Sequence, residues 1–267
     1  MLLPATIIDA LPPTVPGIGG AALTAFQIFA ASTSFSTEVN PSTTAQYSKF
    51  AQLNKNNTGK ETMVKSRNGM TLIYLPAFLA SSLIYSNIIP NSPVSSLAAL
   101  FLVAHFFKRL FEVFFIHKYS GTVSLTLSSI IGIYYALVTT LICFVANPIP
   151  DVASVQIGSG IFTIGLAGNL YHHYLLANLR KTKSADKKYI APRGGLFNFV
   201  AAPHYLFELM AWLGIAIVSQ HTNAYLVFAT MTSYLSGRSV AQNNFNKEQF
   251  SDVDWPADRR NIVPFLF

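Results

Sequence analysis

The chain has 267 residues, of which 51% are hydrophobic and only 11% are charged, and its net charge is +7. This composition is typical of an integral membrane protein and excludes an ordinary soluble domain. The single cysteine, Cys143, excludes an intrachain disulfide, and the basic residues gather between apolar segments, which argues against a nucleic-acid-binding protein.

Seven apolar segments have about the length that a bilayer crossing requires. They cover residues 16–36, 69–90, 95–116, 121–147, 155–178, 197–219 and 222–237. If the chain crosses at each of them, every Lys and Arg falls on one side, because the connections on the other side contain neither. The positive-inside rule then places the N-terminus in the lumen and the C-terminus in the cytoplasm. We predict one all-α, polytopic membrane domain over residues 1–267 with seven transmembrane helices.

The first connection, residues 37–68, is rich in Ser, Thr, Asn and Lys, and we interpret it as a polar cytoplasmic loop. Its Asn56-Asn57-Thr58 matches a glycosylation acceptor, but it lies on the cytoplasmic side of this topology, so we reject that match. No Lys or Arg precedes Lys49, so we expect no cleavable signal peptide.

Polar residues share one face at the end of the third segment. His105, Arg109 and Glu112 are spaced i, i+4 and i+7, so Arg109 and Glu112 can pair within the helix. On spacing alone, an interfacial cluster that only anchors the helix explains these residues equally well.

A similar stripe in the fifth segment contains Asn169, His173 and Arg180 and leads toward the cytoplasm. Two interpretations stay open: the stripe receives an anionic ligand, or Asn169 only hydrogen-bonds a neighbouring helix, worth roughly 1 kcal/mol. His172, His173 and His204 are metal-ligand types, but adjacent histidines on a helix point about 100° apart. No carboxylate-rich motif accompanies them, so we expect no metal.

Residues 189–212 are the most informative stretch. Arg193-Gly194-Gly195 follows a basic run and offers backbone N–H groups beside cationic side chains, an arrangement that suits phosphate. The helix expected after it carries His204 and Glu208 at i and i+4 on one face. Because a carboxylate at membrane depth is costly without a partner or a function, we expect the chemistry here.

Several separated motifs resemble the steroid 5-alpha-reductase family, in the right order. They are residues 104–109 with 115–120, residues 189–197 with 203–208, and the ending, residues 262–267. The resemblance covers about residues 65–267 and is strongest to plant and fungal members. Trans-2-enoyl-CoA reductases and polyprenal reductases are relatives of this family.

The resemblance implies an enzyme of the endoplasmic reticulum membrane that uses NADPH to reduce a carbon–carbon double bond conjugated to a carbonyl. Residues 104–267 would form its catalytic and cofactor-binding region. With the two glycines of the phosphate-binding argument, the expected cofactor-site residues are Asn169, His173, Arg180, Tyr189, Gly194, Gly195, His204, Glu208, Arg238 and Arg259.

The catalytic pair departs from the family pattern. Steroid-reducing members use a Glu in the second helix and a Tyr in the third to hold the substrate carbonyl, whereas the matching positions here are Tyr74 and Phe106. A preorganised donor at that oxygen lowers the barrier most. We therefore hypothesise that the Tyr74 hydroxyl replaces this pair as the hydrogen-bond donor to the substrate carbonyl, with a contribution from His105.

Three functions remain as alternatives. The first is reduction of a lipophilic 3-oxo-4-ene steroid-like substrate, which enters from the lipid bilayer while NADPH enters from the cytoplasm. The second is trans-2-enoyl-CoA reduction in fatty acid elongation. The third is non-catalytic sterol or lipid binding, which Phe106 favours and the retained Asn169, Arg180 and Glu208 oppose.

Overall fold

The computed structural model describes residues 12–45, 61–86, 96–179 and 189–267. Its long helices are α2 (Gly17–Val39), α3 (Ser66–Tyr85), α4 (Ser96–Phe111), α5 (Leu125–Val145), α6 (Val152–Leu179), α7 (Pro203–Ser219) and α8 (Thr222–Gln249). A π-helix, η2 (Glu112–Ile116), continues α4, and a 3-10 turn, η3 (Gly195–Asn198), precedes α7. Two short strands, β1 (Met63–Lys65) and β2 (Thr122–Ser124), pair antiparallel.

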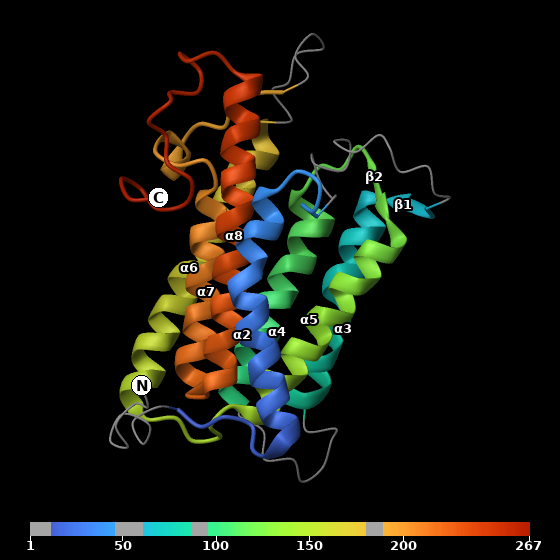
Figure 1. The fold of residues 1–267 in the computed structure, drawn as a ribbon, viewed down its shortest axis with the longest axis vertical. Coiled ribbons are helices and arrows are strands. Elements are labelled where there is room, and N and C mark those ends of the chain that lie inside the picture. Colours follow the sequence, from blue (N-terminus) through green and yellow to red (C-terminus); the bar gives the residue numbers. More distant parts are fainter. Residues whose placement is uncertain (1–11, 46–60, 87–95, 180–188) are drawn as a thin grey trace.

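The long helices run side by side as one bundle (Figure 1). Helix α2 packs against α8, α3 against α5, and α6 against α7, so neighbours in space are often distant in sequence. The strand pair and the C-terminal segment lie at the same end of the bundle (Figure 1). That end also holds the segment between α6 and α7, where the Arg-Gly-Gly sequence lies.

The prediction of a largely helical membrane protein is confirmed. Among the described residues, α2, α3 and α5 are long and apolar enough to cross a membrane, and α7 is a shorter apolar helix. Each of the seven apolar segments contains a long helix. The number of crossings and the direction of the chain stay predictions.

Element boundaries were predicted less well. Helix α8 continues to Gln249, well beyond residue 237. The segment predicted at 197–219 is broken, because the helix begins only at Pro203, whose ring suits a first helical turn and disfavours helix at the residue before it. The loop predicted at 37–68 contains the end of α2, strand β1 and the start of α3, and its residues 46–60 lie outside the described ranges.

Glycines let α6 approach α7 closely. A Cβ added at Gly165 would lie 2.4 Å from the backbone nitrogen of Ala211 and 2.7 Å from the carbonyl oxygen of Phe207. Both neighbours are backbone atoms, so they cannot rotate away. Small residues at such contacts bring two helix backbones together, and this contact sets the position of the helix that carries His204 and Glu208.

We expect Gly165→Ala to lower the free energy of unfolding by about 1–3 kcal/mol, because the added methyl group overpacks the α6–α7 contact. Gly160→Ala on the same helix is the matched control, since a Cβ there would meet nothing within 4 Å. Thermal unfolding of the detergent-purified variants measures the difference. Equal midpoints for the two variants would contradict the close packing.

Candidate active site

Nine polar side chains gather inside the bundle, toward the end that holds the Arg-Gly-Gly segment. They come from α3, from α4 with η2, from α6 and from α7, and we call them the polar cluster: Tyr74, His105, Lys108, Arg109, Glu112, Asn169, His173, His204 and Glu208. Burying this many polar groups is costly unless they pair with one another. The observed contacts show how they pair.

Glu112 lies at the centre of the polar cluster and is fully buried. Its carboxylate oxygens lie 3.2 Å from Lys108 Nζ, 2.8 Å from an Arg109 Nη atom and 3.0 Å from His173 Nδ1. The predicted pairing of Arg109 with Glu112 within one helix is thus confirmed. The anchoring interpretation is wrong, because this group is buried and contacts a second helix.

The π-helix η2 begins at Glu112. The backbone N–H of His117 donates to the Glu112 carbonyl oxygen at 2.8 Å, which is the wider turn of a π-helix. Single π turns inside α-helices occur often at functional sites. Here the π-helix begins at one of the three charged residues, Glu112, and follows the other two, Lys108 and Arg109 of α4.

Arg109 connects Glu112 to α3. One Nη atom contacts Glu112 and also lies 3.1 Å from His173 Nδ1, while the other donates to the Tyr74 hydroxyl. The guanidinium carbon lies 4.6 Å from the centre of the Tyr74 ring, within the range of a cation–π contact. The predicted catalytic residue Tyr74 therefore lies directly against a fixed cation.

Asn169 joins the two faces predicted on α6 and α7. Its side-chain oxygen accepts from Lys108, and its amide nitrogen donates to the carbonyl oxygen of His204 at 2.7 Å. The helix–helix hydrogen bond considered for Asn169 therefore exists. The ring of His173, one turn along the same helix, lies 5.3 Å from that of His204.

His105 and Glu208 form the deeper part of the polar cluster. His105 Nε2 lies 3.3 Å from a Glu208 oxygen, and the His105 ring lies 5.2 Å from that of Trp212. Phe106 is fully buried, with its ring 5.5 Å from Tyr135. The position that the resemblance matches to a tyrosine is thus filled by an apolar ring within an aromatic group.

Six buried polar atoms of this region have no hydrogen-bond partner among the described residues, and two of them, Arg109 Nε and Glu112 Oε1, belong to the ion-paired groups described above. The other four are His105 Nδ1, His204 Nδ1, Glu208 Oε2 and Trp212 Nε1. Native structures pair nearly all buried polar groups, so such atoms mark places where a ligand or water completes the hydrogen bonding. Three of the four lie on α7, at i, i+4 and i+8.

The segments at residues 189–202 and 250–267 form a cap over the polar cluster. They are joined by hydrogen bonds from Ala201 N to the Arg260 carbonyl oxygen, 2.8 Å, and from Arg260 N to the Phe199 carbonyl oxygen, 3.0 Å. Phe197 of η3 is buried, and its ring lies 6.0 Å from that of His204. The cap therefore rests directly on one member of the cluster.

Gly194 and Gly195 shape the start of the cap. Both have positive φ, 90° and 52°, which glycine adopts without strain. A Cβ at Gly195 would lie 2.9 Å from His172 Nε2, so the backbone approaches α6 closely. His172 accepts there from Leu196 N at 3.2 Å.

Arg259 and Tyr189 lie in the cap. Arg259 is stacked 4.0 Å over the Trp255 ring, and Tyr189 packs on Phe245 with ring centres 5.2 Å apart. Burial and the positive charge of Arg193 lower the pKa of Arg259, although an arginine stays charged at neutral pH. A bound anion would relieve this unfavourable burial.

Two predicted site residues are not part of this arrangement. Arg238 is buried on α8 and donates to Glu38 of α2 at 2.9 Å and to the Ala45 carbonyl oxygen at 2.8 Å. It ties α2 to α8. Arg180 lies outside the described residues, so the structure does not place the end of the predicted stripe.

Glu112, His117 and His173 are close enough to hold a metal ion, with one ligand atom of each within 4.8 Å of the others. However, Lys108 and Arg109 contact the same carboxylate. Two cations beside the only carboxylate ligand oppose a divalent ion. This group of residues does not fit a metal site.

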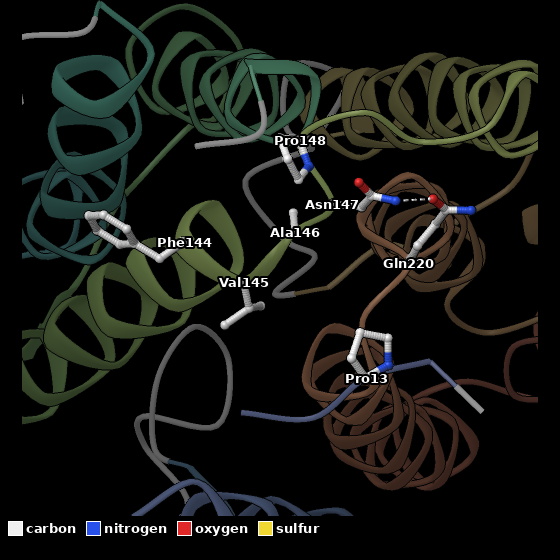
Figure 2. A pocket seen from close by; sticks show the side chains of 7 residues that line it. All are labelled: Pro13, Phe144, Val145, Ala146, Asn147, Pro148 and Gln220. Atoms are coloured by element: carbon white, nitrogen blue, oxygen red, sulfur yellow. Dashed lines mark hydrogen bonds between the residues drawn. The ribbon is translucent and has the colours of Figure 1, made fainter. Parts of the chain in front are cut away.

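One cavity among the described residues lies away from the polar cluster. It has a volume of about 380 Å³ and is lined by Pro13, Phe144, Val145, Ala146, Asn147, Pro148 and Gln220. Figure 2 shows it with the hydrogen bond from Asn147 to Gln220, 2.8 Å. Gln220 follows α7 and His204 is the second residue of this helix, so about 24 Å of helix separates them. This cavity is not the candidate active site.

Sequence reasoning missed three residues of the site. Lys108 lies at i−4 from Glu112 and Trp212 at i+4 from Glu208, so helical spacing was a usable signal for both. Tyr135 belongs to α5, and no spacing links it to Phe106 or Tyr74. Only the packing of α5 against α3 brings it there.

The chain was compared with known proteins. The family model described as 3-oxo-5-alpha-steroid 4-dehydrogenase matches residues 109–267, which is more than half of the chain. The very-long-chain enoyl-CoA reductase of Dictyostelium discoideum is 29% identical over 203 residues, covering 74% of this chain and 67% of the relative. Human 3-oxo-5-alpha-steroid 4-dehydrogenase 1 is 38% identical over 112 residues, covering 42% and 41%. The steroid 5-alpha-reductase DET2 of Solanum lycopersicum is 34% identical over 111 residues, covering 42% of each.

Proposed function

This chain belongs to the 3-oxo-5-alpha-steroid 4-dehydrogenase family, and from that premise we propose that it reduces a carbon–carbon double bond conjugated to a carbonyl in a lipophilic substrate, with NADPH as the reductant. As a member of this family it is an oxidoreductase that acts on CH–CH groups. The observation that carries the proposal is the polar cluster, whose donors and unpartnered atoms lie inside an apolar bundle.

The residues present fit a nicotinamide dinucleotide. A nicotinamide carboxamide both donates and accepts hydrogen bonds, and the unpartnered Glu208 Oε2 and His204 Nδ1 offer partners for it. A phosphate suits the close backbone turn at Gly194 and Gly195, together with the buried, stacked Arg259. NADPH is proposed over NADH because the basic side chains at the cap end of the bundle suit a 2′-phosphate.

The chemistry assigns separate tasks to the protein. A bound nicotinamide supplies the hydride that adds to the β-carbon of the substrate. Negative charge then builds on the carbonyl oxygen, where the Tyr74 hydroxyl donates a hydrogen bond, assisted by His105. A proton must finally reach the α-carbon. We assign this proton to His105, whose Nε2 contacts Glu208.

The topology proposed is seven crossings of the endoplasmic reticulum membrane, with the C-terminus in the cytoplasm. Two observations support it. Long helices occupy all seven apolar segments, and the described basic loop residues, such as Lys118 and Arg193, lie at the end of the bundle that carries the cap. In this topology the cofactor enters from the cytoplasm through the cap, and a lipophilic substrate enters from the bilayer.

Two substrate classes are candidates. A 3-oxo-4-ene steroid agrees with the family model. A trans-2-enoyl-CoA is favoured by a specific observation: the very-long-chain enoyl-CoA reductase of Dictyostelium discoideum matches 74% of this chain, whereas the human steroid enzyme matches 42%. Both substrates carry a double bond conjugated to a carbonyl, so one polar cluster serves either.

Cofactor binding tests the proposal first. Both tryptophans, Trp212 and Trp255, lie in the site region, so energy transfer from tryptophan to the reduced nicotinamide reports binding. We expect the purified protein to bind NADPH more tightly than NADH and then to oxidise NADPH in the presence of one of the two substrates. Binding of neither nucleotide would overturn the reductase proposal in favour of non-catalytic lipid binding.

We expect Glu208→Gln to weaken NADPH binding by about ten- to hundredfold, because a hydrogen bond to a charged acceptor is lost and the contact with His105 changes. Glu248→Gln is the matched control, since Glu248 is exposed on α8. Titration of NADPH by energy transfer measures both affinities. Equal affinities of the variant and the wild type would remove Glu208 from the cofactor site.

A further inference from the structure

We propose that Arg109 is a positioning residue for the reaction: it holds the Tyr74 phenol and makes it a stronger hydrogen-bond donor to the substrate carbonyl. The inference rests on the proposed function and goes beyond it. The positions that the resemblance matches to the family's Glu and Tyr hold Tyr74 and Phe106 in this chain, so the donor that replaces them needs a support of its own.

The first supporting observation is the direction of the hydrogen bond between Arg109 and Tyr74. An arginine side chain has only N–H donors, so in its hydrogen bond with Arg109 the Tyr74 oxygen is the acceptor. This bond therefore does not use the phenolic proton. A cation that donates to the phenol oxygen withdraws electron density from it, which strengthens the O–H as a donor, as in other hydrogen-bond chains of low dielectric.

The second supporting observation is that several contacts fix the Arg109 side chain. Its other Nη atom is held by Glu112 at 2.8 Å and by His173 at 3.1 Å, and Glu112 is fully buried. The guanidinium also covers the Tyr74 ring at 4.6 Å. The planar, forked group thus contacts three separate elements at once, η2, α6 and α3, which a lysine cannot do in the same way. Glu112 and Arg109 together fix the orientation of Tyr74.

A comparison with Lys108 distinguishes this role of Arg109 from a general requirement for positive charge near Glu112. It neighbours Arg109 and contacts the same carboxylate at 3.2 Å, but its other partner is Asn169 on α6. If charge near Glu112 were all that mattered, Lys108 and Arg109 would affect turnover in the same way. If Arg109 acts through Tyr74, only Arg109 is energetically coupled to that hydroxyl.

A double-mutant cycle tests the proposal on the full-length, detergent-purified protein. Arg109→Lys keeps a positive charge, whereas Tyr74→Phe removes the hydroxyl, and thermal unfolding of each variant checks its folding. We expect Arg109→Lys to lower kcat about ten- to hundredfold in the wild-type background, with the NADPH affinity unchanged. In the Tyr74→Phe background the same substitution should lower kcat by less than about threefold. Lys108→Met should have equal effects in both backgrounds.

A spectroscopic measurement that requires no turnover accompanies the double-mutant cycle. The ultraviolet absorption of a tyrosine depends on the hydrogen bonding of its hydroxyl, so the difference spectrum between wild type and Arg109→Lys should vanish in the Tyr74→Phe background. Equal kcat losses in both backgrounds, or no loss in the wild type, would overturn the positioning role. A wild type that reduces neither substrate would instead refute the proposed function, and the role of Arg109 in it, even if the spectral coupling were present.

Discussion

Tyr74→Phe is expected to lower kcat by about 100- to 1000-fold while the affinity for NADPH stays within about twofold of the wild type. The substitution removes one hydroxyl that stabilises charge on the carbonyl oxygen and leaves the ring in place. The ring contacts, 4.6 Å to Arg109 and 6.1 Å to Tyr135, require no hydroxyl. The substitution also removes the hydroxyl that accepts from Arg109, so thermal unfolding is measured beside turnover to separate the loss in the chemical step from a loss of stability.

Single-turnover reduction at saturating NADPH measures this step, once the substrate class is known. Tyr85→Phe is the matched control, because it makes the same chemical change at an exposed position of the same helix. A Tyr74→Phe variant that turns over at the wild-type rate would remove Tyr74 from the reaction. His105 would then be the remaining donor of the predicted pair.

Glu112→Gln is expected to lower the free energy of unfolding by about 3–5 kcal/mol. Glu112 is fully buried and neutralises both Lys108 and Arg109, so an uncharged amide leaves two buried cations without their counter-charge. Removing one partner of a buried ion pair costs far more than replacing the whole pair by apolar groups. The double variant Glu112→Met with Lys108→Met should therefore recover part of the loss.

Thermal unfolding in detergent compares these variants, with Glu248→Gln as an exposed control. If the double variant recovers stability, the loss in Glu112→Gln comes from unbalanced charge. A simple packing defect would instead become worse, because the second substitution removes another contact. A shift in the unfolding midpoint of less than about 2 °C for Glu112→Gln corresponds to less than about 1 kcal/mol and would contradict the central role of this carboxylate.

The sequence predicted the faces of the helices well, because helical spacing alone determines which side chains share a face. The Arg109–Glu112 pair, the stripe of Asn169 with His173 and the stripe of His204 with Glu208 all rest on this rule, and the structure brings them into one cluster. Periodicity does not determine which faces meet. The contacts of Tyr74 with Arg109 and of His105 with Glu208 span different helices and could not be predicted from it.

Helix α8 shows the same limit at an element boundary. Its apolar pattern fades near residue 237, yet the helix continues to Gln249. Asn243, in the polar part, donates to the Arg259 carbonyl oxygen at 2.9 Å and accepts from Trp255 Nε1 at 2.8 Å. These partners belong to the cap, so tertiary contacts rather than local hydropathy support the last turns.

By itself, the sequence determined a helical membrane protein of this reductase family, because apolar length, the distribution of basic residues and separated motifs are all local properties of the chain. Only the tertiary structure decided the partners inside the bundle. It paired Arg238 with Glu38 rather than with the polar cluster, and it placed Arg109 against Tyr74. The physical reason is that a buried charge is stable only beside its counter-charge, and the packing of distant helices determines which one is within reach.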